Sequence, residues 1–419
     1  MLIRGGILLD PSRDLQARLD LRLAGTRIAE AGEHLRPEPG EEVIEADGAF
    51  VAPGFIDMHV HLREPGFEWK ETIATGTEAA VRGGFTAVAC MPNTRPALDA
   101  PEVLDDLRAR CDREARCRVH PIAAVTKARA GAEPCDYAAL RRAGAVAFSD
   151  DGDTVMDAAL LRTAATALRG LGAPIISHAL DAALHRGAAM HEGEVSRRLG
   201  LPGSPAAAEE VIVARDLVLA HATGARWHIA HLSTAGALEL VRWARAHGVG
   251  ITCEVTPHHL TFTDEAVERL GGAAVVNPPL RTADDARALR EAVRRGEIDA
   301  FATDHAPHTR EEKERDSREA APGFTGLEIA VGAYASAVPD LPPLRFVALL
   351  STNPASILGL EGGTLAPGAP ADITIFRDEA WRVESARFAS KGRVTPFDGM
   401  TLPRRAIVTI VGGKVAWRA

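Results

Sequence analysis

The chain has 419 residues, enough for one large domain with an appendage or for two or three ordinary domains. Hydrophobic residues make up 46% of it and charged residues 25%, which is typical of a soluble globular protein. The formal net charge of −9, without a basic tail, argues against a nucleic-acid-binding surface.

Three further absences narrow the class of protein. No apolar run reaches the roughly 18 residues that a membrane helix needs. The N-terminus shows no long apolar segment of the kind that signal peptides contain. Five cysteines are scattered without a Cys-x-x-Cys pair. We therefore expect a cytoplasmic protein with reduced thiols, no membrane contact and no nucleic-acid partner.

Short strand-like runs broken by glycine and proline occupy both ends of the chain. Near the start they include "LIRGGILLD" and "EVIEADGAFVAPG", and near the end "ADITIFRDE" and "RAIVTIVGGKVAWRA". This similarity predicts one small β-sandwich domain that is formed by both termini. Its residues are expected to be 1–52 plus 363–419, and residues 53–362 form the domain between them.

The middle of the chain alternates between buried strands and amphipathic helices. The predicted strands are GFIDMHVH (54–61), FTAVACMP (85–92), RVHPIAAVT (118–126), GAVAFSDD (144–151), APIISHA (173–179), RWHIAHLS (226–233), GITCEVTPHH (250–259) and IDAFATDH (298–305). Segments 207–224, 234–248 and 282–296 between them have helical spacing and end in glycine. Eight such units predict an α/β fold, a (β/α)8 barrel of the TIM type. A doubly wound open sheet is the alternative, but it normally has a glycine-rich loop after its first strand, which is absent here.

Polar residues gather at the carboxyl ends of these strands, where barrel enzymes place their active sites. His59 and His61 lie two apart in "GFIDMHVHLREPG", so they share one face of a strand. The strand ends also contribute Arg63, Asn93, Asp150, Asp151, His178, His231, Asp304, His305 and His308.

Imidazole and carboxylate groups without thiolates suit Zn2+ or another borderline divalent ion. Four histidines and two carboxylates are too many ligands for one tetrahedral ion with an open position. They suit two ions that share a carboxylate and activate a bridging water. Asp150 and Asp151 compete for one ligand position, because neighbours on a strand point to opposite faces. Asp57 lies deeper on the same face and is expected to support a ligand. His228 lies three residues from His231, so we expect it to face the helices.

With these residues the chain resembles the amidohydrolase superfamily and, within it, the class I dihydroorotases. The segments that carry the resemblance span nearly the whole chain: DMHVHLREPG, MPNT, FSDDG, HIAHLST, EVTPHHL, NPPLR, ATDHAPH and APGFTGLE. Together these motifs are highly specific.

The resemblance implies a ligand set and a substrate site. It implies two zinc ions per subunit, one held by His59, His61 and Asp304, the other by His178 and His231, with Asp151 as the bridge. Many superfamily members bridge instead with a carboxylated lysine at the end of the fourth strand, where this chain has none, and Lys127 is the one nearby alternative. Arg63, Asn93 and His308 match positions that hold the substrate carboxylate. His61, Asn277, Pro322 and Gly323 match further substrate contacts.

The implied activity is that of a dihydroorotase, which reversibly closes N-carbamoyl-L-aspartate to L-dihydroorotate and water in pyrimidine biosynthesis. In the hydrolytic direction a metal-bridged hydroxide attacks the ring amide, and Asp304 acts as general base and then general acid. Residues 308–324 are highly charged, and we expect an active-site loop there; a solvated charge run is the alternative.

Two rival functions follow from the same motifs. A hydantoinase or allantoinase would act on neutral rings, which do not need the positions of Arg63, Asn93 and His308. A catalytically inactive scaffold would serve as a partner of aspartate transcarbamoylase, but this chain keeps every ligand position. An active enzyme can also bind that transcarbamoylase, and we expect a homo-oligomer.

Overall fold

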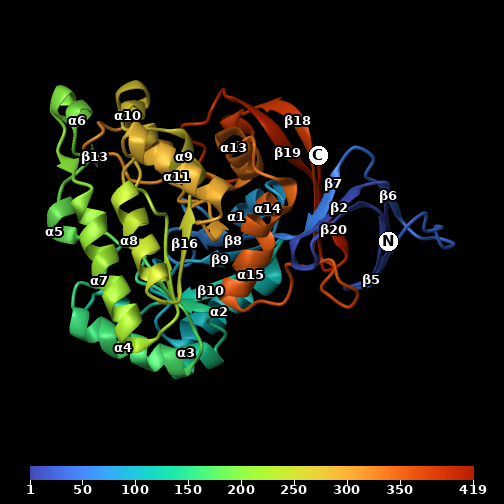
Figure 1. Ribbon diagram of the computed structural model, residues 1–419, viewed down its shortest axis with the longest axis horizontal. Helices are drawn as coiled ribbons and strands as arrows, with labels where there is room; N and C mark the ends of the chain where they lie inside the picture. Colours follow the sequence, from blue (N-terminus) through green and yellow to red (C-terminus); the bar gives the residue numbers. More distant parts are fainter.

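The computed structural model describes residues 1–419, with a helix-covered barrel on one side and sheets on the other, where both termini lie (Figure 1). Eight parallel strands lie in the order β17-β16-β15-β12-β11-β10-β9-β8. A single bridge between Val60 of β8 and His305, which follows β17, connects the two ends of this sheet, so the barrel is nearly closed. The predicted barrel is confirmed.

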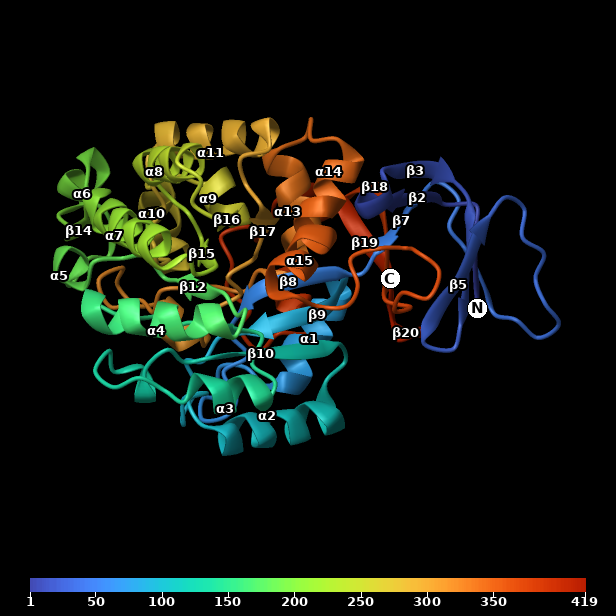
Figure 2. The same cartoon turned by 60° about the horizontal axis from the view of Figure 1, so that its bottom comes forward.

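Every predicted barrel strand is present, although β11 and β17 have only two residues each. The strands are β8 (Phe55–Val60), β9 (Phe85–Cys90), β10 (Arg118–Ala123), β11 (Ala147–Phe148), β12 (Ile175–Ser177), β15 (Trp227–Ile229), β16 (Ile251–Val255) and β17 (Ala300–Phe301). The helices around them are α1 (Ile73–Arg82), α2 (Pro101–Glu114), α3 (Tyr137–Arg142), α4 (Ala158–Gly170), α7 (Ala207–Thr223), α8 (Ala235–Ala246), α11 (Ala283–Arg295), α13 (Ala330–Ala337), α14 (Pro343–Val347) and α15 (Asn353–Leu358). Figure 2 shows α2, α3 and α4 along one side of the barrel.

Shorter elements extend the loops at the carboxyl ends of the strands. They are α5 (Ala182–His185), β13 (Met190–His191), α6 (Glu194–Leu199), β14 (Gly203–Ser204), α9 (Pro257–Thr261), α10 (Glu265–Leu270) and α12 (Arg310–Lys313). Two of the three predicted glycine stops are present: α7 and α11 end at Gly224 and Gly296, which take the left-handed conformation that glycine adopts without strain. The third is wrong by one residue, because α8 ends at Ala246 with His247, and not Gly248, as its cap.

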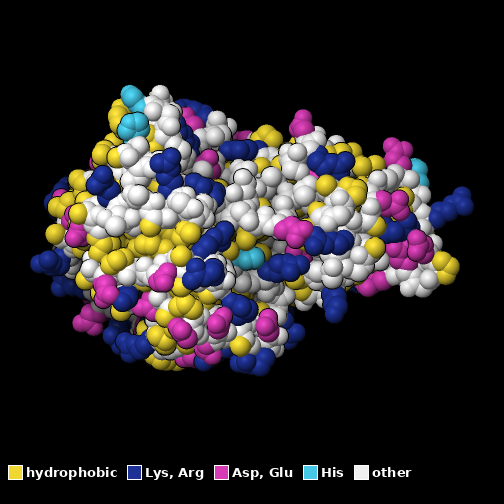
Figure 3. Space-filling model, turned by 90° about the horizontal axis from the view of Figure 1, so that it is seen from below, with side chains coloured by type: hydrophobic (Ala, Val, Ile, Leu, Met, Phe, Trp, Pro, Cys, Tyr) yellow, Lys and Arg dark blue, Asp and Glu magenta, His cyan; other side chains and the backbone are white.

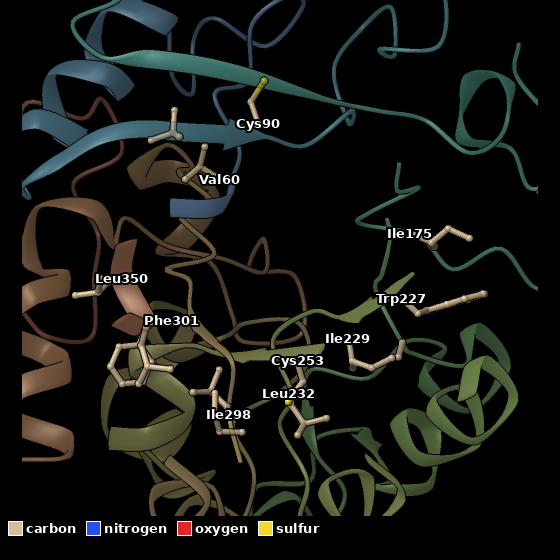
Figure 4. Close-up of a cluster of buried hydrophobic side chains, with 14 of the residues drawn as sticks. Val60, Cys90, Ile175, Trp227, Ile229, Leu232, Cys253, Ile298, Phe301 and Leu350 are labelled. Atoms are coloured by element: carbon tan, nitrogen blue, oxygen red, sulfur yellow. The ribbon is translucent and has the colours of Figure 1, made fainter. Parts of the chain in front are cut away.

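The main apolar core lies between the strands and the helices. It contains 66 buried residues, and Figure 4 shows part of it, with Ile175 of β12 close to Trp227 and Ile229 of β15. A much smaller cluster of 12 residues, including Met58 and Ile122, draws on most of the strands and fills the barrel interior. These two clusters supply the apolar packing of the barrel, so the side chains at the carboxyl ends of the strands can be polar.

Both termini build a second, β-rich part of the molecule. One sheet has the order β5-β4-β1-β6, and the other has the order β20-β19-β18-β7-β2-β3. Their strands are β1 (Leu2–Arg4), β2 (Ile7–Asp10), β3 (Leu15–Arg18), β4 (Asp20–Ala24), β5 (Arg27–Gly32), β6 (Val43–Glu45), β7 (Phe50–Pro53), β18 (Ile373–Arg382), β19 (Thr401–Val411) and β20 (Lys414–Arg418). Ile3, Ile44 and Ile373 from the two sheets share one apolar cluster, as in a sandwich. The boundaries at residues 52 and 363 stay a prediction.

The segment between β18 and β19 leaves this sandwich and packs on the barrel. Phe388 and Phe397 share a cluster with Phe262 and Phe324, which lie in loops after β16 and β17. The carbonyl oxygen of Gly392 accepts a hydrogen bond from the Thr325 hydroxyl. The C-terminal segment therefore supports the loops around the carboxyl ends of the barrel strands.

The surface carries no large field of one sign on the face in Figure 3. Lysine and arginine side chains are interspersed there with aspartate and glutamate, and hydrophobic stretches lie between them. None of the helices is both long and apolar enough to cross a membrane.

Candidate metal centre and active site

The six predicted ligand side chains meet at the carboxyl ends of the barrel strands. His59 lies on β8 and His61 follows it, and the others follow β11, β12, β15 and β17: Asp151, His178, His231 and Asp304. All six residues are buried, with exposed fractions of 8% or less. Five of them border a cavity of about 180 Å³, which is also lined by Arg63 and Asn277.

The donor atoms fall into two groups that share one carboxylate. His59, His61 and Asp151 form one group, and Asp151, His178 and His231 form the other, with the donor atoms of each group within 4.8 Å of one another. Asp304 lies beside the first group, with its Oδ1 atom 3.1 Å from Nε2 of His61 and 3.5 Å from Nε2 of His59. Two adjacent places with a shared oxygen ligand are therefore available.

These donors fit divalent metal ions. The Nε2 atom of His59 and the Oδ1 atom of Asp151 lie 3.3 Å apart, and both are buried without a hydrogen-bond partner. Burial disfavours charge on both groups, yet the nearby carboxylates Asp151 and Asp304 raise the pKa of His59 well above its usual value. Burial likewise opposes ionisation of Asp151, but His59 and the other histidines hold its pKa well below the usual range. Carboxylate and imidazole groups that are left facing each other in this way are typical of a cation site.

Three of the site residues adopt backbone conformations that are rare for residues other than glycine. Arg63, His231 and Asp304 have φ values of 63°, 32° and 49°. Each follows the end of a strand, where the left-handed turn aims its side chain into the mouth of the barrel. Such strain persists only where the surrounding structure enforces it, and it concentrates at functional sites.

Glu254, on β16, supports both groups of ligands from below. Its Oε1 atom is 2.8 Å from Nδ1 of His59 and accepts a hydrogen bond from the backbone nitrogen of His231 at 3.3 Å, and its other oxygen is 3.2 Å from Nε2 of His228. Burial would raise the pKa of Glu254, but the hydrogen bonds with His228 and His59 lower it to about 2. The carboxylate is therefore ionised and fixes which nitrogen of His59 faces Asp151.

The expectation that His228 faces the helices is wrong. Its side chain is fully buried, and its ring nitrogens meet Glu254 and the hydroxyl of Thr252. A spacing of three residues gives opposite faces only along a regular strand, but β15 ends at Ile229 and the left-handed turn at His231 breaks the alternation. His228 thus belongs to the support of the site.

Asp57 supports a ligand as expected, and it does so through the backbone of His59. The register between β8 and β9 shifts between Asp57 and Val60, so the side chains do not alternate regularly there. The Asp57 carboxylate accepts hydrogen bonds from Thr303 and from the backbone nitrogen of His59.

Replacing Glu254 with glutamine should lower the affinity for Zn2+ by about tenfold to a hundredfold, the usual effect of losing such a supporting carboxylate. Competition with a chromophoric chelator measures this affinity without any assay of activity. Glu209→Gln is a matched control, since Glu209 is equally buried but bonds Ser233 instead of a ligand. Equal affinities of the two variants would contradict the role of Glu254.

Arg63 and His308 lie on one side of the cavity, joined to a network that the sequence did not predict. An Nη atom of Arg63 lies 3.2 Å from Nε2 of His308. Nδ1 of His308 lies 3.2 Å from Nζ of Lys70, which also pairs with Glu312 at 2.9 Å. Burial, with Arg63 and Lys70 nearby, lowers the pKa of His308 to about 2, so its ring is neutral. Partial burial lowers the pKa of Arg63 to about 10, which leaves it charged at neutral pH.

The remaining predicted contacts also border the cavity. Asn93 bonds Nδ1 of His61 through its Oδ1 atom, at 2.8 Å, so its amide NH2 group stays free as a donor. Oδ1 of Asn277 is buried without a partner. Gly323 has a φ of 118°, and a Cβ atom there would lie 2.6 Å from the side chain of Ala306, so only glycine fits beside Pro322.

Neither of the alternative ligands, Asp150 and Lys127, reaches the ligand cluster. Asp150 turns away from the site and bonds the backbone of Val125 and Thr126. Lys127 is exposed and pairs with Glu133, so it does not reach the ligands. His259 bonds Thr256 and the carbonyl of Pro278, whereas both ring nitrogens of the buried His258 lack partners. The loop 308–324 has an exposed charged outer surface, but His308 and Lys313 within it are buried against the site.

A family model matches part of this chain, and curated relatives match nearly all of it. Residues 48–237 match the family model described as "Dihydro-orotase-like". A dihydroorotase of Pelotomaculum thermopropionicum is 51% identical over 99% of this chain and 98% of its own length. One of Syntrophus aciditrophicus is 44% identical over 100% of this chain and 99% of its own length. This chain belongs to the dihydroorotase family.

Two solved structures share the fold of this member of the dihydroorotase family. An L-hydantoinase from Arthrobacter aurescens covers 99% of the chain with a TM-score of 0.89 and 24% identity, which concerns the fold alone. A D-hydantoinase from a Thermus species covers all of it with a TM-score of 0.85 and 28% identity. Each match takes in 95% of the solved chain. The protein is thus an enzyme of the metal-dependent cyclic amidohydrolase type, and the shared fold includes the sheets built from both termini.

Proposed function

We propose that this enzyme interconverts L-dihydroorotate and N-carbamoyl-L-aspartate, as a step of pyrimidine biosynthesis. The observation that carries the proposal is 51% identity to a dihydroorotase over nearly the full length of both chains. The guanidinium group of Arg63 beside the ligand cluster supports it, since an anionic ring needs a cationic group at this place.

The proposed metal is zinc, with two ions per subunit. His59, His61 and Asp304 would hold one ion, His178 and His231 the other, and Asp151 would bridge them. When bound, such a pair supplies a nucleophile derived from water at neutral pH and polarises the carbonyl that is attacked.

The chain's own residues bind the substrate and move the proton. Arg63, Asn93 and His308 hold the carboxylate of dihydroorotate, and Asn277 with the backbone at Pro322 and Gly323 meets the ring. Asp304 accepts the proton of the attacking water while oxygen bonds to the ring carbonyl carbon. The bond from that carbon to the ring nitrogen then breaks, and Asp304 delivers the proton to the departing nitrogen. In the direction of cyclisation the same carboxylate takes the proton from that nitrogen.

The supporting experiment follows the ultraviolet absorbance of L-dihydroorotate with zinc-replete enzyme. Dihydrouracil and hydantoin serve as neutral rings in parallel assays. We expect fast loss of dihydroorotate and, because neutral rings leave Arg63 without its partner, much slower loss of the other two. Faster turnover of the neutral rings would favour a hydantoinase, and no turnover of any ring with zinc bound would favour an inactive scaffold.

The quaternary structure and the location in the cell stay predictions. We propose a homo-oligomer that works in the cytoplasm. A complex with aspartate transcarbamoylase is the further partner expected from the resemblance to class I enzymes.

A further inference from the structure

Lys313 is a buried cation without an acidic partner. It lies at the end of α12, in the loop 308–324, and its exposed fraction is 1%. It forms no ion pair, and burial alone lowers the pKa of its ammonium group to about 7. Burying an unpaired ammonium group is unfavourable, so an apolar residue of similar length would be the expected choice for packing alone.

The ammonium group of Lys313 instead joins two backbone segments. Its Nζ atom donates hydrogen bonds to the carbonyl oxygen of Val275 at 2.9 Å and to that of Ala321 at 2.7 Å. The carbonyl of Val275 also accepts a hydrogen bond from the backbone nitrogen of Gly323 at 3.0 Å. Both segments border the cavity, since Val275 comes two residues before Asn277 and Ala321 comes directly before Pro322 and Gly323.

Three consecutive residues of the loop are held in this way. Ala321 is bonded by Lys313, the carbonyl of Pro322 lies 3.0 Å from Nε2 of His308, and the nitrogen of Gly323 bonds Val275. The backbone of Lys313 also packs closely against Gly272, where a Cβ atom would lie 2.1 Å from the Lys313 carbonyl oxygen.

The residue before Lys313 contacts the carboxylate-binding part of the cavity through His308. Glu312 pairs with Lys70 and lies 3.3 Å from Nδ1 of His308. Two adjacent residues of α12 therefore hold both the carboxylate side, at His308, and the ring side, at Pro322 and Gly323. A loop that served only as a solvated charge run would not need either contact.

We propose that Lys313 is a positioning residue that clamps the loop 308–324 onto the segment of Asn277 and so sets the distance between the two sides of the substrate ring. The inference rests on the proposed function, because it assigns the ring contacts to Asn277, Pro322 and Gly323. It adds a residue that touches no substrate and acts through the backbone.

The test compares Lys313→Met, which keeps the length of the side chain but has no donor, with the wild-type enzyme. Loss of hydrogen bonds from a charged donor should raise the KM for dihydroorotate by about tenfold, while kcat changes less than about threefold. Trypsin cleavage after Arg315 and Arg318, both exposed in the same loop, should become about tenfold faster, because the loop opens more often. Lys313→Gln retains an amide donor and should give intermediate values.

Lys391→Met is the matched control. Lys391 also donates to a backbone carbonyl, that of Glu68, but it is exposed and lies outside the loop. If Lys313→Met and Lys391→Met have the same KM and the same cleavage rates, the clamp is refuted. Faster cleavage with an unchanged KM also overturns the proposal, since the clamp would then not position the substrate. If Lys313→Met does not fold, the KM and cleavage rates of Lys313→Gln decide by the same criteria. No turnover of dihydroorotate by the wild-type enzyme refutes the proposed function instead, and the cleavage rates still test the clamp.

Discussion

Replacing Asp304 with asparagine is expected to lower kcat about 10²- to 10⁴-fold in both directions of the reaction, the range for losing a general acid–base group. The carboxylate lies 3.1 Å from Nε2 of His61, and the neighbouring histidines hold its pKa below the usual range despite its burial. It is therefore ionised at neutral pH, which is the form that a general base must have. Asparagine has nearly the same shape and keeps an oxygen for a metal ion, but it cannot carry that proton.

The assay should be made with zinc-saturated enzyme, together with elemental analysis of the metal content. Asp153→Asn is the control, because Asp153 is an exposed carboxylate at the same end of the barrel that pairs with Arg129. Near-normal turnover of the Asp304 variant with both metal ions bound would show that another group moves the proton. A loss of activity that only follows a loss of metal would assign Asp304 to binding alone.

Replacing Arg63 with glutamine should lower kcat/KM for dihydroorotate by roughly 30- to 4,000-fold, the equivalent of about 2–5 kcal/mol for one partner of a desolvated charge pair. Activity on hydantoin, which has no carboxylate, should change little. The substitution thus alters the ratio of the two activities, and parallel kinetics on both substrates measure it.

Arg63→Lys separates charge from geometry at this position. Lysine keeps the positive charge but not the planar pair of donors, so an intermediate loss is expected. Arginine, lysine and glutamine all carry a Cβ atom, so the left-handed backbone at residue 63 affects the two variants similarly. A proportional loss on both substrates would contradict a role in carboxylate recognition and would point to a general disturbance of the site.

The residues that approach one another at the site could be predicted because each ends a strand of a parallel barrel. The period of two places His59 and His61 together, and the barrel topology adds the ends of the other strands. The same period gave the wrong direction for the His228 side chain, because the left-handed turn at His231 cannot be predicted from the residue types there. Glu254 and Lys313 were missed for a related reason. Each is a single charged residue whose partners lie far away in the sequence, and its burial depends on how the strands and loops assemble.

The alternation of strands and helices predicted the fold, but it did not predict the lengths of the elements. The predicted strands 144–151 and 298–305 shrink to β11 and β17, because their last residues turn out of the sheet to form the site. Residues 383–400 gave no signal of their contact with the barrel, since their aromatic residues are as compatible with a sheet as with a loop.

The pairing of β7 with β18 has a consequence for synthesis on the ribosome. Pro53 lies beside Ile373, so about 320 residues are made between the two partners, which takes about 15–60 s at typical elongation rates. During that time the N-terminal strands have a hydrogen-bonding edge without its final neighbour, while the barrel emerges and folds. Unpaired edges invite association with other chains. The nascent chain therefore stays exposed to aggregation after its barrel has been made, until β18 has left the ribosome and pairs with β7.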